Sequence, residues 1–268
     1  MGPAPVSEQF AACIAAEEST IALDEMALLI AAHAHPGLDL AAELARLDNL
    51  ALGCPDDPDG LARHLVSAHG FGGNVTDYHD PSNSFLDDVL TRHTGIPITL
   101  SVLMIAIGQR LGVELIGVGM PGHFIVGTAS DDHGRRTYFD LFSDGATRSA
   151  SDCRRQFESS YPGVEFESRF LQPVGPRAIA RRMLTNLEQS YGARDPAHLA
   201  WVTALQLAIP GTPPAQRRRL AARLGALGAY DSAAAALDAL ADESGSEAGG
   251  AAVERLRASA RAQRARGN

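Results

Sequence analysis

The sequence predicts an α+β protein with a helical N-terminal part, a small antiparallel sheet in the middle and a helical C-terminal part. Three observations predict this order. Apolar residues recur at helical spacing up to about residue 111, short β-rich runs follow between residues 114 and 141, and helical spacing returns after residue 174. The 268 residues, 45% of them hydrophobic and 21% charged, exclude a disordered or multi-span membrane chain.

The first of three predicted domains, residues 1–80, is a helical extension. Three segments carry apolar residues at intervals of three and four, and the last of them stops before the glycines at 70, 72 and 73. The three apolar sets are Leu23, Met26, Leu29 and Ile30; Leu40, Leu44 and Leu47; and Leu61, Leu65 and Val66.

The second predicted domain, residues 81–172, begins with two helices. Ser84 follows a run of turn-forming residues, and we expect it to cap a short helix that stops at Gly95. A longer helix is predicted to start at Pro97, because the fixed φ and missing N–H of proline suit the first helical position, and to reach Leu111. This helix is apolar almost all round, which favours a place in the middle of a domain.

Three strands are predicted after this helix, at residues 115–118, 123–126 and 137–141. The last two are expected to form an antiparallel hairpin whose loop is centred between Asp131 and Asp132. Residue numbers that sum to 263 then face each other, so His123 is predicted to lie opposite Asp140 on one face of the sheet. A carboxylate so placed can fix the tautomer of an imidazole that acts as a general base.

The third predicted domain, residues 173–268, is helical, with breaks near residues 195–196, 210–214, 228 and 244–250. Residues 228–233 and the interval of 33 residues from Ala200 to Ala233 are typical of a tetratricopeptide repeat. An alanine-rich helical bundle fits the same residues equally well.

The distribution of charge and the use of cysteine indicate the cellular compartment and the classes of partner to expect. Residues 1–164 hold 9 arginines against 22 acidic residues, whereas residues 165–268 hold 14 arginines against 10. The basic part has no interleaved aromatic residues, so no nucleic-acid partner is expected. The chain begins without a signal-peptide pattern, no apolar run is long enough to span a membrane, and the three cysteines form no CxxC pair. We therefore expect a cytoplasmic protein without a membrane partner.

A set of motifs in the middle of the chain carries a family resemblance. The motifs are Asn83-Ser84, Val89-Leu90, Gly95-Ile96-Pro97 and Gly117 to Phe124 (GVGMPGHF), with Gly70 to Asn74 and Tyr78 upstream and Ala178 to Asn186 downstream. Over about residues 20–242 the chain resembles the SirB-type bacterial proteins of the transglutaminase-like superfamily. The resemblance implies a papain-like or transglutaminase-like α+β core, in which a central helix packs on a small antiparallel sheet, with an N-terminal helical extension and a C-terminal helical-repeat domain.

The same resemblance implies a dyad that has lost its nucleophile. Catalytic relatives begin the central helix with a cysteine, and successive strands supply a histidine and an aspartate. His123 and Asp140 match the second and third positions, and Pro97 stands in the place of the cysteine. The resemblance thus favours a non-catalytic protein that binds a protein or peptide partner through its groove and its C-terminal helices.

An amide-bond hydrolase or transferase is the alternative, with a nucleophile supplied from another position. Its candidate hydroxyls and thiol are Ser82, Ser84, Thr99, Ser101 and Cys54. The predicted groove is lined by Asn83, Ser84, Thr99 and Ser101.

No cofactor or metal site is predicted from spacing. His33 and His35 point to different sides of a helix, and His64 and His69 are five residues apart, so neither pair has the i, i+4 spacing of a helical metal clasp. The acidic run at residues 56–60 is interrupted by proline and lacks the glutamate that closes a calcium loop.

Overall fold

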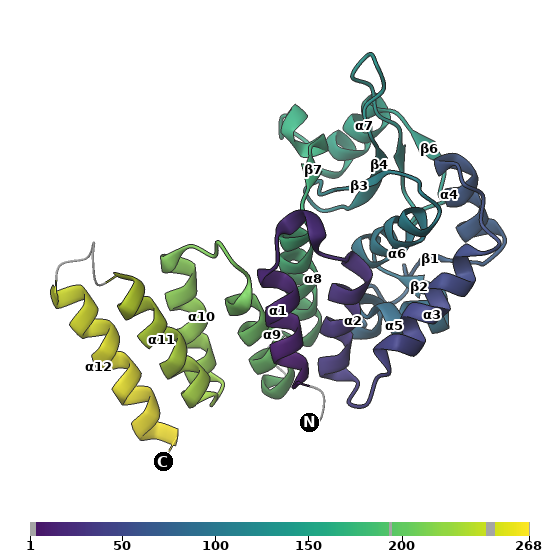
Figure 1. Ribbon diagram of the computed structural model, residues 1–268. Coiled ribbons are helices and arrows are strands. Elements are labelled where there is room, and N and C mark those ends of the chain that lie inside the picture. Colours follow the sequence, from purple (N-terminus) through teal and green to yellow (C-terminus); the bar gives the residue numbers. More distant parts are fainter. Residues whose placement is uncertain (1–3, 193–194, 245–249, 268) are drawn as a thin grey trace. The chain divides into compact units, whose positions relative to one another are not determined.

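A computed structural model describes residues 4–192, 195–244 and 250–267 (Figure 1). The chain forms two compact units: residues 16–183 make one, and residues 1–15 together with 184–268 make the other. The boundaries expected at residues 80 and 172 stay a prediction. None of the described helices combines the length and the hydropathy that a membrane crossing requires.

The unit of residues 16–183 begins with the helical part that the apolar spacing predicts. A short 3-10 turn precedes three helices, and Asp39 and Asp57 cap the second and third through their side chains, which accept hydrogen bonds from the N–H groups of Ala42 and Gly60. These elements are η1 (Glu18–Thr20), α2 (Leu23–Ala34), α3 (Leu40–Ala51) and α4 (Pro58–Ser67). The three predicted helices are confirmed.

The central helix is α6 (Pro97–Arg110), with proline at its start as predicted. Every residue from Pro97 to Gly108 is buried, and the helix packs against α2 and α3 as well as against the sheet. The prediction that Ser84 caps the preceding helix is wrong. Ser84 ends the 3-10 turn η2 (Pro81–Ser84), and Phe85 occupies the cap position of α5 (Leu86–Arg92) without a side-chain hydrogen bond.

The five-stranded sheet is antiparallel throughout and has the order β6-β5-β4-β3-β7. Its strands are β3 (Leu115–Val118), β4 (Ile125–Thr128), β5 (Tyr138–Phe139), β6 (Thr147–Arg148) and β7 (Pro173–Val174). A separate parallel pair joins β1 (Gly72–Gly73) to β2 (Thr94–Gly95). The sequence gives no clear signal for β6, β7, β1 and β2, each of which is only two residues long.

The predicted register of the β4–β5 hairpin is wrong: the numbers of facing residues were predicted to sum to 263, and the observed sum is larger by two. Val126 pairs with Phe139 and Gly127 with Tyr138, so facing residues sum to 265. The Asp131 carboxylate accepts hydrogen bonds from the N–H groups of His133 and Arg135, which moves the turn toward the second strand. Because side chains alternate with a period of two, this shift leaves the predicted set of residues on the same face.

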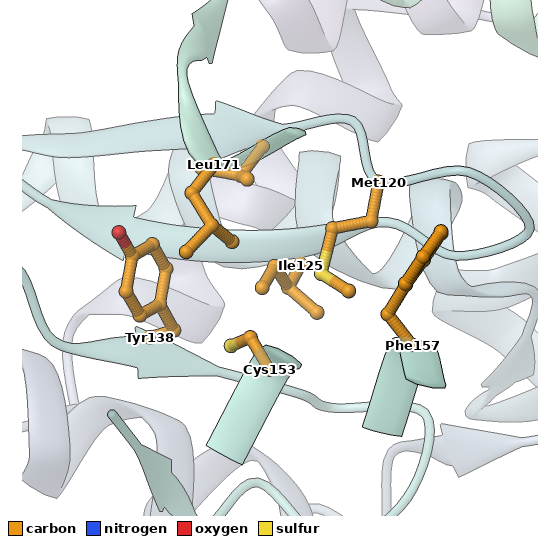
Figure 2. Close-up of a cluster of buried hydrophobic side chains, with 7 residues drawn as sticks. Met120, Ile125, Tyr138, Cys153, Phe157 and Leu171 are labelled. Carbon is orange, nitrogen blue, oxygen red and sulfur yellow. The ribbon is translucent and has the colours of Figure 1, made fainter. Parts of the chain in front are cut away.

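One face of the sheet packs on α7 (Ala150–Ser160), as Figure 2 shows. The buried cluster joins residues of β3, β4 and β5, and Met120 from the turn after β3, to two side chains of α7 and to Leu171 of the 3-10 turn η3 (Ser168–Leu171). Its members are Val118, Met120, Ile125, Tyr138, Cys153, Phe157 and Leu171. Helix α6 contacts β3 and β4, and in Figure 1 it lies on the opposite side of these strands from α7.

The other unit is entirely helical in its described part. It contains α1 (Val6–Ala15), which packs against α9 (Pro196–Ala208), followed by α10 (Pro214–Ala226), α11 (Tyr230–Ser244) and α12 (Gly250–Gly267). Helix α8 (Pro176–Tyr191) contains the boundary between the units. The breaks predicted at residues 195–196, 210–214 and 228 are confirmed, whereas residues 245–249 lie outside the described residues. The tetratricopeptide repeat stays a prediction.

Candidate functional site

His123 and Asp140 form a hydrogen-bonded dyad. The His123 Nε2 atom lies 2.8 Å from the Asp140 Oδ2 atom. His123 follows a turn in which Gly122 has a φ of 70°, and it precedes β4 instead of belonging to that strand as predicted. Asp140 directly follows β5. The contact that the sequence predicts is therefore made by residues just beyond the paired ends of the two strands.

Asp140 is almost completely buried, with 1% of its side chain exposed, against 15% for His123. Its carboxylate also accepts hydrogen bonds from the Ser143 hydroxyl, at 2.9 Å, and from the Phe142 N–H, at 3.2 Å. Burial acts to raise the pKa of Asp140, but the hydrogen bond and charge of His123 and the Ser143 hydroxyl outweigh burial and hold that pKa below its usual range. The carboxylate is ionised at neutral pH.

Strand β1 connects the dyad to the start of α6. The Gly73 N–H donates to the Phe142 carbonyl at 3.1 Å, and the next N–H, of Asn74, donates to the Gly95 carbonyl at 3.0 Å. Gly95 lies two residues before Pro97. A Cβ atom on Gly73 would lie 2.5 Å from the Phe142 carbonyl oxygen, so only glycine permits this approach.

Aromatic and cationic side chains that the sequence did not predict as site residues lie near the dyad. The Phe142 ring lies edge-on to the His123 ring, with centroids 6.3 Å apart, and 5.8 Å from the Tyr78 ring. Arg182 of α8 donates to the Met120 carbonyl at 2.8 Å. Burial lowers the pKa of Arg182, although Tyr78 partly opposes this. The aspartate–turn pattern after Asp140 could have indicated Phe142, whereas no local pattern indicates Arg182.

The candidate hydroxyl nucleophiles make no hydrogen bond to the imidazole among the described residues, and the Ser82 hydroxyl bonds to the carboxylates of Asp80 and Asp88. The Ser101 hydroxyl donates to the Pro97 carbonyl within α6, at 2.8 Å. The hydroxyls of Ser84 and Thr99 are buried and have no hydrogen-bond partner among the described residues. Over the same residues, Asp140 is the one side chain that hydrogen-bonds the His123 ring.

The remaining predicted groove residue, Asn83, holds the loop before α6. The Asn83 side chain accepts from the Asn74 amide at 3.1 Å and donates to the Asp77 carbonyl at 2.7 Å, and the Asn83 carbonyl accepts from the Ile96 N–H. Asn83 is completely buried, so it positions this loop and is not open to a ligand.

Two cavities differ in their relation to the dyad. A cavity of about 100 Å³ is bordered by His123 together with Gln156, Ser160 and Tyr161 of the α7 region. A larger one, of about 350 Å³, is mostly apolar and lies between the end of α6, β3, β7 and α8. The larger cavity contains neither dyad residue, so the smaller cavity is the one relevant to the dyad.

Two groups of side chains whose donor atoms are close enough to hold a metal ion occur elsewhere in the described chain. One comprises Cys54, His64 and His69, and the other His35, Asp87 and Asp88. Spacing did not predict the first group, because its cysteine comes from the loop before α4. Cys54, a candidate nucleophile, belongs to this group and makes its hydrogen bond to the Leu50 carbonyl, not to the dyad.

Residues 22–185 match the transglutaminase-like superfamily. The chain belongs to this superfamily. The matched residues include Pro97, His123 and Asp140, and they cover more than half of the chain. The SirB-type assignment is finer than this match and stays a prediction.

Similar proteins come from bacteria and from mammals. A UPF0162 protein of Xylella fastidiosa is 32% identical over 224 residues, which cover 76% of this chain and 77% of that protein. A UPF0162 protein of Pseudomonas aeruginosa is 30% identical, with 68% of each chain covered. The F-box only protein 21 of Mus musculus is 30% identical over 143 residues, which cover 51% of this chain and 22% of that protein.

Proposed function

We propose that this protein is a non-catalytic member of the transglutaminase-like superfamily, which acts in the cytoplasm by binding a protein or peptide partner. One observation carries the proposal. The dyad of His123 and Asp140 is formed, but the central helix begins with Pro97, which has neither a thiol nor a hydroxyl. Acyl transfer by nucleophilic catalysis needs such a group beside the base.

The surrounding hydroxyls support a binding role. A general base activates a nucleophile that lies within about 2.6–3.2 Å of it. Ser101 is bonded to its own helix, and Ser84 and Thr99 are buried. Ser143 does approach the dyad, but it donates its proton to Asp140 and not to the imidazole. The alternative enzyme would have to rearrange one of these side chains.

The dyad then serves as a structural link. Asp140 receives hydrogen bonds from the turn before β4, through His123, and from the turn after β5, through Ser143 and Phe142. A buried carboxylate with several donors joins these two turns and holds His123, which borders the small cavity, in place.

The partner-binding surface is proposed to lie on the C-terminal helices. Neighbouring helices pack pairwise from α9 to α12, and stacked helices commonly bind extended or helical peptides. The arginine excess of residues 165–268 favours an acidic partner segment. Arg218 and Arg219 of α10 are exposed and offer charges for such contacts.

The decisive experiment compares the wild type with the His123→Ala, Asp140→Ala double variant. Both are assayed for hydrolysis and transamidation of peptide amides and are used for affinity capture from source cells. We expect no enzymatic difference between them and the same captured partner. A matched Arg218→Glu, Arg219→Glu variant is expected to lose the partner. Wild-type turnover that the double variant lacks would establish the enzyme alternative instead.

A further inference from the structure

Cys54, His64 and His69 come together at the end of α4. Cys54 lies in the loop that joins α3 to α4, His64 in the last turn of α4, and His69 just after it. One ligand atom from each side chain lies within 4.8 Å of the others, and the two imidazole centroids are 5.0 Å apart. All three side chains are partly buried.

These donors have the chemistry that a zinc ion selects. Thiolate and imidazole are the usual protein ligands of Zn²⁺, at about 2.3 and 2.0–2.1 Å. A tetrahedral site with those bond lengths places ligand atoms about 3.3–3.6 Å apart. Small side-chain rotations bring atoms within 4.8 Å to that spacing.

The hydrogen bonding of Cys54 and His69 leaves both side chains available. The His69 Nε2 atom is buried and has no hydrogen-bond partner among the described residues, which is costly for a polar atom. The Cys54 thiol donates to the Leu50 carbonyl at 3.2 Å. This hydrogen bond is weak, and it is lost when the thiol gives up its proton to bind a metal. A bound cation would satisfy the buried nitrogen.

We infer that Cys54, His64 and His69 bind one Zn²⁺ ion, with a water molecule as the fourth ligand. On binding, the Cys54 thiol loses its proton to solvent and the sulfur forms the bond to zinc, without any change of oxidation state. The ion joins the α3–α4 loop to the segment that leads into β1. Since β1 holds the Phe142 carbonyl through Gly73, zinc stabilises the backbone beside the dyad. This inference does not depend on the proposed function.

The second group of candidate ligands provides the main competitor. His35 Nδ1 already contacts Asp87 at 2.6 Å, and its Nε2 lies 3.6 Å from Asp88. Both nitrogens of this ring are thus engaged by carboxylates. A metal ion bound there would have no sulfur ligand, which makes the two sites distinguishable by spectroscopy.

The test uses the full chain, freed of metal with a chelator and titrated with Zn²⁺ and Co²⁺. We expect one Zn²⁺ per chain, a higher melting temperature with zinc, and a thiolate-to-Co²⁺ charge-transfer band in the ultraviolet. Cys54→Ser should abolish this band. Each of the variants Cys54→Ser, His64→Asn and His69→Asn should weaken zinc binding by more than about a hundredfold, since even removing a partner of a ligand costs 10–100-fold.

Matched controls are Cys13→Ser, which removes another partly exposed thiol, and His133→Asn, which removes an exposed imidazole. Both should bind zinc like the wild type. Circular dichroism establishes that each variant is folded. The wild type alone also decides the matter: a cobalt complex without a charge-transfer band, or zinc binding below one equivalent at micromolar metal, overturns the inference. Equal zinc binding by Cys54→Ser and the wild type overturns it as well.

Discussion

Replacing Asp140 with alanine tests whether the dyad holds the two turns together. The substitution leaves three donors without their acceptor: the His123 ring, the Ser143 hydroxyl and the Phe142 N–H. A hydrogen bond to a charged group contributes about 1.5–3 kcal/mol. Ser143 is exposed and the Phe142 N–H makes a longer bond, so water can replace Asp140 as the acceptor for both, and most of the loss comes from the shorter bond of the largely buried His123 ring. We expect a loss of about 3 kcal/mol in local stability, at the lower end for a broken buried pair.

The measurement must report on the unit that contains the dyad. The single tryptophan, Trp201, belongs to the other unit, so its fluorescence does not serve. Amide hydrogen exchange at Thr128, which donates to the Thr137 carbonyl across the hairpin, reports the local opening. A loss of 3 kcal/mol corresponds to exchange that is faster by about a hundredfold.

The control is Asp144→Ala in the same turn. Asp144 is exposed and pairs with Arg148 four residues on, so we expect a change below about 1 kcal/mol. Because the pKa of Asp140 is lowered on folding, its contribution is present above the unfolded value of about 3.9 and is lost as the pH falls through the folded value. Similar exchange in both variants, or a difference undiminished at low pH, refutes the reasoning.

Three further predictions concern other parts of the same unit. Gly73→Ala should destabilise the protein by about 2 kcal/mol in thermal denaturation, because its Cβ meets the Phe142 carbonyl, whereas Gly72→Ala, whose Cβ meets open space, should change little. Burial raises the pKa of Cys153 to about 11, so thiol reagents at pH 8 should label it only after unfolding, as peptide mass spectrometry would show. Arg110→Ala should lower the free energy of unfolding in urea by about 2 kcal/mol, since it leaves a buried aspartate unpaired; a loss below 0.5 kcal/mol would contradict this.

The helices could be predicted from the sequence because their signals are long and redundant. Helix α6 carries buried residues on all sides over three turns, and proline marks its first position. The start of α5 shows the limit of this reasoning. Ser84 has the side chain of a helix cap, but it is the last residue of the 3-10 turn η2, so Phe85 occupies the cap position of α5. The packing of the buried loop, rather than the local helix propensity, sets the residue at which α5 begins.

The dyad could be predicted although the register could not. A hairpin loop can shift the pairing by one residue on each strand, and here the hydrogen bonds of the Asp131 carboxylate do so. His123 and Asp140 then lie beyond the paired residues, where a turn brings them into contact. The alternation of side chains is the part of the argument that survives such a shift. Whether the dyad can catalyse acyl transfer depends on the residue at position 97, and the pattern of the strands gives no information about that residue.

The hardest feature to predict is also the one that joins the site together. Strand β1 consists of two glycines, which have no side chains to pattern and low strand propensity. Its position is set by steric room, because only a glycine lets the backbone approach Phe142 so closely. The N–H of the following residue, Asn74, then donates to the Gly95 carbonyl just before the central helix. The dyad and the helix start are therefore coupled through backbone hydrogen bonds rather than through side chains. A substitution at Gly73 should disturb both ends of the site while leaving every candidate catalytic residue intact.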